Sequence, residues 1–162
     1  MSTVSRTGGT GVQMAVTALN SLANSATAGW QSARVDNTSE GAGEYDINIK
    51  IDLANTAAAN DKAIYVYLVP WFYDGSAWTP GADGGTATLP GGTEGTYTIG
   101  ATHNLRPVKV LAYTAADQVV CGQFTLTGVG DGWSLVIVNY TGAAIAASGN
   151  VVQYKPVHYT SA

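Results

Sequence analysis

Few residues of this chain could carry acid–base or metal chemistry, and they are scattered along it. The two histidines, His103 and His158, have no Cys, His, Asp or Glu beside them at a metal-ligand spacing. The single cysteine, Cys121, alternates with Val119 and Gln123, which predicts a buried, unreactive thiol on a strand. Motifs for a nucleophilic serine, a phosphate-binding loop or a thiolate metal site do not occur. The sequence therefore predicts no catalytic residue, no cofactor and no enzyme.

The densest acidic group, and the best candidate for a metal site, consists of Asp36, Glu40, Glu44 and Asp46. Calcium prefers several oxygen ligands that one loop brings together. The order D-N-T-S-E-G-A-G-E-Y-D, however, lacks the ligand spacing of an EF-hand, and a solvated acidic loop accounts for the same residues. We therefore predict no bound metal.

The segment 43–53 alternates strictly between apolar and polar residues, which is typical of a half-buried β-strand. Its apolar side consists of Tyr45, Ile47, Ile49, Ile51 and Leu53. Its polar side consists of Glu44, Asp46, Asn48, Lys50 and Asp52. Charges on a strand face usually keep a sheet soluble or pair across strands. We expect the polar side to meet solvent or a polar subunit contact, and no substrate.

Four aromatic residues, Trp71, Phe72, Tyr73 and Trp78, gather at the start of a long loop predicted over 74–96. They could pack beneath that loop as a small core of their own. They could equally anchor a protein interface, where exposed aromatic residues contribute much of the binding energy. Stacking on a sugar ring is the third interpretation. All four are candidate protein-contact residues.

The N-terminal segment 1–13 is rich in glycine and small polar residues and has no apolar period. This composition predicts a flexible arm, which either stays disordered or becomes ordered on a partner's surface. Thr7, Gly8, Gly9 and Val12 are its candidate contact residues. We expect one folded domain over 14–162.

About eight short strands separated by turn signals, without a convincing helix, predict an all-β fold. The expected strands cover 30–35, 43–53, 63–73, 96–99, 108–113, 119–127, 133–140 and 150–157. Pro70 should end ladder pairing or lie at a sheet edge. An antiparallel β-sandwich of the jelly-roll type accommodates this number of strands.

Composition excludes several classes of partner. The net charge is −4 and the seven lysines and arginines are dispersed, so a basic surface for nucleic acid is not expected. No apolar run approaches the roughly 18 residues of a membrane span. The first residues, MSTVSRTGGTG, lack the hydrophobic core of a secretion signal, which indicates synthesis in a cytoplasm.

Only 11% of the 162 residues are charged, against about 25% in an average protein. Much of the surface must therefore be neutral and polar, which suits a protein packed against other proteins. We expect self-association, as a dimer or a trimer.

Two regions together are similar to small structural proteins of tailed double-stranded DNA bacteriophages. The first is SLANSATAGWQSARVDNTSEGAGEYDINIKIDL, which leads into AANDKAIYVYLVPW, and the second is GWSLVIVNYTGAAIAASGNVVQYKPV. The resemblance covers about residues 17–157, apart from much of the 74–96 loop. Its motifs are turn and packing residues.

This resemblance implies a jelly-roll decoration (cement) protein on the outer surface of a phage capsid. Its partners would be the major capsid protein and copies of itself, and its location would be the virion. A tail, collar or head-fibre component that contacts the host surface is the first alternative. A carbohydrate-binding module, with Trp71, Tyr73 and Trp78 as its platform, is the second, and an enzyme is the weakest.

Overall fold

The computed structural model describes residues 4–54, 62–81, 92–98 and 105–161, so His103 lies outside it. None of the residues it describes is helical, and the all-β prediction is confirmed. The strands are β1 (Val4–Gly8), β2 (Val12–Gln13), β3 (Ala28–Gln31), β4 (Val35–Asp36), β5 (Glu44–Asp52), β6 (Lys62–Tyr73), β7 (Trp78–Pro80), β8 (Gly95–Thr98), β9 (Arg106–Tyr113), β10 (Val119–Thr127), β11 (Gly132–Asn139) and β12 (Val151–Ser161).

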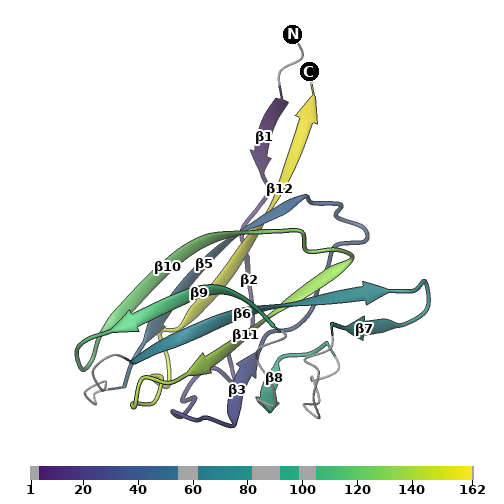
Figure 1. The fold of residues 1–162 in the computed structure, drawn as a ribbon. Coiled ribbons are helices and arrows are strands. Elements are labelled where there is room, and N and C mark those ends of the chain that lie inside the picture. Colours follow the sequence, from purple (N-terminus) through teal and green to yellow (C-terminus); the bar gives the residue numbers. More distant parts are fainter. Residues whose placement is uncertain (1–3, 55–61, 82–91, 99–104, 162) are drawn as a thin grey trace.

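The strands form two antiparallel sheets that pack as a sandwich (Figure 1). The five-stranded sheet has the order β1-β12-β5-β10, with β2 also beside β12. The seven-stranded sheet has the order β7-β6-β11-β3-β8, with β9 beside β6 and β4 beside β11. Eight of the strands thus fall into two groups of four, β2-β12-β5-β10 and β3-β11-β6-β9. This is the strand order of a jelly roll, the architecture that the sequence predicts.

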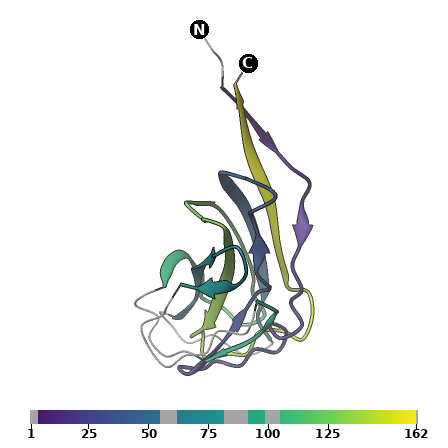
Figure 2. The same ribbon diagram turned by 90° about the vertical axis from the view of Figure 1, so that its right-hand side faces the viewer.

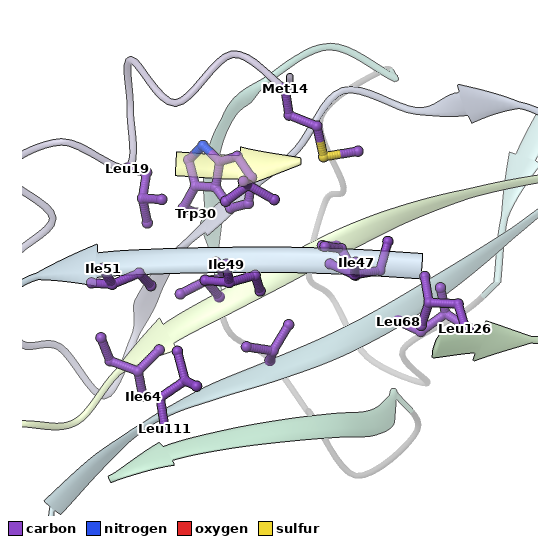
Figure 3. Packing of buried hydrophobic residues seen from close by; sticks show 14 of the residues in the cluster. Met14, Leu19, Trp30, Ile47, Ile49, Ile51, Ile64, Leu68, Leu111 and Leu126 are labelled. Atoms are coloured by element: carbon purple, nitrogen blue, oxygen red, sulfur yellow. The ribbon is translucent and has the colours of Figure 1, made fainter. Parts of the chain in front are cut away.

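The core lies between the two sheets and follows from the two-residue period of the strands. Ile47, Ile49 and Ile51 of β5 point inward and are at most 2% exposed. They belong to one cluster with Trp133 and Leu135 of β11 and with side chains of β6 and β9 (Figure 3). The apolar side of the alternating segment is therefore the core side.

The strand β11 is buried along its whole length, because both of its faces are covered. A second apolar cluster lies on the outer side of the seven-stranded sheet and consists of Val69, Trp71, Tyr97, Leu105, Val136 and Val138. Within it, the indole N–H of Trp71 donates to the Ser134 hydroxyl at 2.9 Å. The near-continuous apolar run WSLVIV reflects this two-sided burial.

Two sequence expectations about β6 and its loop are refined by the structure. Pro70 lies inside β6, at the junction where pairing with β9 ends at Leu68 and pairing with β7 begins at Trp71. The Pro70 carbonyl accepts the Gly81 N–H at 2.7 Å, so the missing proline N–H faces this junction and breaks no ladder to β9. The predicted 74–96 loop contains the short strand β7, and its residues 82–91 lie outside the described part.

The N-terminal segment is not a free arm in the residues that the structure describes. Residues 4–8 form β1, which pairs with Val157–Ser161, and β2 pairs with Gln153 and Tyr154. The Gly9 N–H donates to the Pro156 carbonyl at 2.8 Å between the two strands. Glycine at this position permits a close approach, since a Cβ there would come within 2.7 Å of the Pro156 ring. The strand β12 continues beyond its pairing with β5 and supplies the partner of β1, which local composition does not reveal.

One buried polar side chain beside the second cluster lowers the stability of the fold. Gln31 of β3 is fully buried, and neither polar atom of its carboxamide has a hydrogen-bond partner among the residues that the structure describes. A desolvated, unpaired polar group costs about 1–3 kcal/mol.

We predict that Gln31→Met raises the free energy of unfolding by about 1–3 kcal/mol, because the thioether keeps the length of the side chain and removes the unpaired amide. Chemical denaturation measures the change. The control is Gln123→Met on the exposed outer face of β10, which should shift stability by no more than about 0.5 kcal/mol. A destabilised Gln31→Met variant would show that the carboxamide is satisfied in solution.

Candidate functional site

The outer face of the five-stranded sheet carries the polar side of the alternating segment. Strand register places Asn48 of β5 between Gln153 of β12 and Gln123 of β10, and Gln13 of β2 beyond Gln153. Four carboxamides therefore lie in one row across four strands. The Gln123 amide donates to the Asn48 carbonyl oxygen at 2.7 Å. This row is the centre of what we call the amide face.

Two adjoining hollows of about 450 and 380 Å³ indent the amide face and share Asn48 and Gln123. Charged side chains of both signs border the row of amides, with Asp46 and Lys155 on one side and Lys50 on the other. The surface is thus broad, polar and close to neutral. It can offer many hydrogen bonds, and its charges are dispersed.

Cys121 lies on the amide face and is exposed, so the prediction of a buried thiol is wrong. On β10 the inward positions are those of Gly122, Phe124 and Leu126, which leaves Cys121 on the opposite parity. The sequence hides this parity, because Val119 and Val120 place apolar residues on both sides of the strand. Cys121 sits directly opposite Lys50.

Ionic and hydrogen-bonded contacts tie β1 to the edge of the amide face. Nη2 of Arg6 lies 2.7 and 2.8 Å from the two carboxylate oxygens of Asp46, which also accepts the Thr125 hydroxyl at 2.8 Å. The Tyr159 hydroxyl donates to Glu44 at 2.5 Å. The Arg6 hydrogen bond first, and then that of Thr125, hold the pKa of Asp46 below its ordinary value.

The acidic group therefore has structural roles where the structure describes it. Asp36 accepts hydrogen bonds from the Thr38 N–H and hydroxyl, and Glu40 lies 4.0 Å from His158. Within the described ranges, no group of three or more His, Cys, Asp or Glu side chains is placed to hold a metal ion. The four carboxylates cap a turn and anchor strands.

The predicted contact residues of the N-terminal segment all lie along β12. Thr7 and Gly8 belong to β1 opposite His158 and Val157, and Val12 lies opposite Tyr154. All five residues of β1 are exposed. Together with Val157–Ser161, β1 forms a two-stranded extension, which we call the terminal ribbon. It projects beyond the sandwich in both views (Figures 1 and 2).

The four aromatic candidates divide between the interior and the surface. Trp71 is 3% exposed and belongs to the second cluster, so it is not available to a partner. Phe72 is 62% exposed at the end of β6, and Tyr73 beside it is 39% exposed. The Trp78 ring contacts Tyr73, at a centroid distance of 4.9 Å, and the Arg34 guanidinium, which lies 4.1 Å from its centroid. The Trp78 ring thus mainly packs against the exposed ring of Tyr73.

No family model matches this chain, and no curated protein matches its sequence. In the part of the chain that the structure describes, no helix is long and apolar enough to cross a membrane.

We predict that Asp46→Asn loosens the terminal ribbon, because it removes the charge that holds Arg6 against β5. Amide hydrogen exchange of Ser5 and Thr7 should accelerate by about two- to fivefold, the range expected for one exposed ion pair. The control Asp117→Asn removes an equal charge from the turn between β9 and β10 and should leave β1 unchanged.

The same contact gives a pH dependence with a defined sign. Because the pKa of Asp46 is lowered from 3.8 in the folded chain, its stabilisation is complete above that pH and is lost as the pH falls through the lowered value. Ribbon protection that is identical in wild type and Asp46→Asn at neutral pH would contradict the anchoring role.

Proposed function

We propose that this chain is a structural protein of a bacteriophage virion, and specifically a decoration protein that binds the outer surface of the capsid. The proposal rests on the amide face, a broad and nearly neutral polar surface that the jelly roll leaves open. The sequence resemblance to small virion proteins of tailed phages supports the same conclusion.

The chemistry of the amide face suits shallow contacts that are repeated many times. Side-chain amides both donate and accept hydrogen bonds, so a row of them can pair with backbone or polar groups on a shell. One such contact is weak. On a lattice of identical subunits, however, many contacts hold the shell together, and a ligand that prefers the intact lattice stabilises it.

The charge of the chain favours the outside of a DNA-filled head. The net charge is −4, and the lysines and arginines form no stripe in the sequence. DNA binding depends on neutralising phosphates with clustered cations. A protein of this composition gains little from the packaged genome, and its partners are expected to be proteins.

The number of copies per particle tests the location. In purified parent virions, quantitative mass spectrometry should find on the order of hundreds of copies, because multivalent attachment depends on repetition over the lattice. About a dozen copies or fewer would instead indicate a tail, collar or fibre component. Absence from the particle would overturn the virion assignment altogether.

A charge placed in the middle of the amide face tests the binding surface. Gln123→Lys should weaken binding to undecorated capsids by about tenfold, because an unpaired ammonium would have to be desolvated in the contact. The matched control is Val110→Lys, which adds the same charge at an exposed position of the other sheet. Equal capsid affinity for the two variants would exclude the amide face as the contact surface.

A further inference from the structure

The terminal ribbon has two open edges in the structure as described. The strand β12 pairs with β5 only as far as Val157, opposite Glu44, so residues 158–161 pair with β1 alone. Within the described ranges no strand lies beyond β1, which ends the order of the five-stranded sheet. Both views show the ribbon standing clear of the sandwich (Figures 1 and 2).

Antiparallel alternation determines which backbone groups the outer edge of β1 presents. The Gly9 N–H points to β12, because it donates to the Pro156 carbonyl. Successive residues of a strand direct their N–H and C=O groups to opposite sides. Thr7 and Ser5 therefore also face β12, whereas the backbone groups of Val4, Arg6 and Gly8 point away from it.

This outer edge lacks the features that keep strand edges from pairing. Natural monomers protect open edges with lysine, proline, inward charges or bulges. The sequence VSRTG has none of these except Arg6, whose charge is held by Asp46 of the same chain. A two-stranded ribbon alone is only marginally stable in water, and further strands are needed to stabilise it.

We propose that the occupant of this edge is a second copy of the same chain, paired antiparallel through β1 about a two-fold axis. The outward groups of Val4, Arg6 and Gly8 are spaced symmetrically about Arg6. Two antiparallel copies can thus satisfy each other's donors and acceptors, as an isologous interface requires. The ribbon carries no acidic residue, and Arg6 is already neutralised, so identical ribbons do not repel strongly.

Pairing of this kind joins two marginal ribbons into one four-stranded sheet with the order β12-β1-β1-β12. The two sandwiches lie at opposite ends of the joined ribbons, because each ribbon extends away from its own sandwich (Figure 2). The amide face of each copy stays open. The inference concerns the isolated chain and does not depend on the proposed capsid role.

Proline substitutions at outward positions test the proposal without breaking the ladder to β12. We would compare Val4→Pro/Gly8→Pro with the matched control Val4→Ala/Gly8→Ala. At Gly8 the new side chain enters open space, since nothing lies within 4 Å of a Cβ there. Two of the three outward N–H groups are lost only in the proline variant, and edge positions tolerate proline.

Sedimentation equilibrium of the full chain should show a dimer for wild type and for the alanine control. The proline variant should dissociate with a dimer Kd at least about 100-fold weaker, because each chain loses two intermolecular hydrogen-bond donors, four in the dimer, and the proline rings block the edge. Protection of the Ser5 and Thr7 amides against exchange reports whether β1 still pairs with β12.

Two results would overturn the proposal. One is a wild-type chain that remains monomeric up to about 1 mM, the weak limit of specific association. The other is a proline variant, with β1 still protected, that dimerises as tightly as the alanine control. Capsid binding by a purely monomeric wild type would overturn the two-fold pairing and leave the decoration role intact, so the two proposals fail separately.

Discussion

The packing of β5 against the core is the constraint on which the other features of this protein depend. Its three inward isoleucines lie in a close-packed interior, and a slip of one residue would turn the whole apolar side of the strand to solvent. The register with β10 and β12 is therefore strongly specified. Core packing fixes this register, and the same register decides which side chains are neighbours on the outer face of the sheet. Asn48 therefore lies beside Gln153 and Gln123, and the row of amides is a consequence of core packing.

A second consequence concerns the length of β12. The same strand completes the five-stranded sheet through residue 157 and then continues, with only β1 as its neighbour. Ordinary core burial cannot stabilise this part, since every residue of β1 is exposed. Its order comes from ladder hydrogen bonds and from Arg6, Asp46, Tyr159 and Glu44 at its base. The sandwich, which is stabilised by its core, and the exposed terminal ribbon thus share one strand, β12. We expect the ribbon to open more readily than the sandwich, and its outer edge leaves backbone groups unpaired.

The surfaces proposed for binding differ in the groups that they offer. The amide face presents side chains from a fully paired sheet, so its contacts depend on side-chain hydrogen bonds and shape. The ribbon edge presents backbone groups, so its contacts depend on strand geometry more than on residue type. The aromatic residues at the end of β6 offer a partner less exposed surface than their number suggests. Trp71 is buried, and Trp78 packs against Tyr73 and Arg34. As proposed, one small domain would make two kinds of contact, neither of which needs a deep pocket.

The sequence by itself determined most of the long strands, because period-two alternation and turn residues are local signals: β10 matches its predicted range, and β5 differs from it only at the ends. The strand predicted over 30–35 is instead two short strands, β3 and β4. It also indicated the jelly roll, through the number and spacing of strands. Tertiary structure alone decided which parity of β10 faces outward, which exposes Cys121, and that Trp71 is buried. It also decided that residues 4–8 form a strand. That outcome depends on β12, about 150 positions away in the sequence, whose edge supplies the hydrogen-bond partners of β1. No local sequence pattern predicts a pairing over this separation.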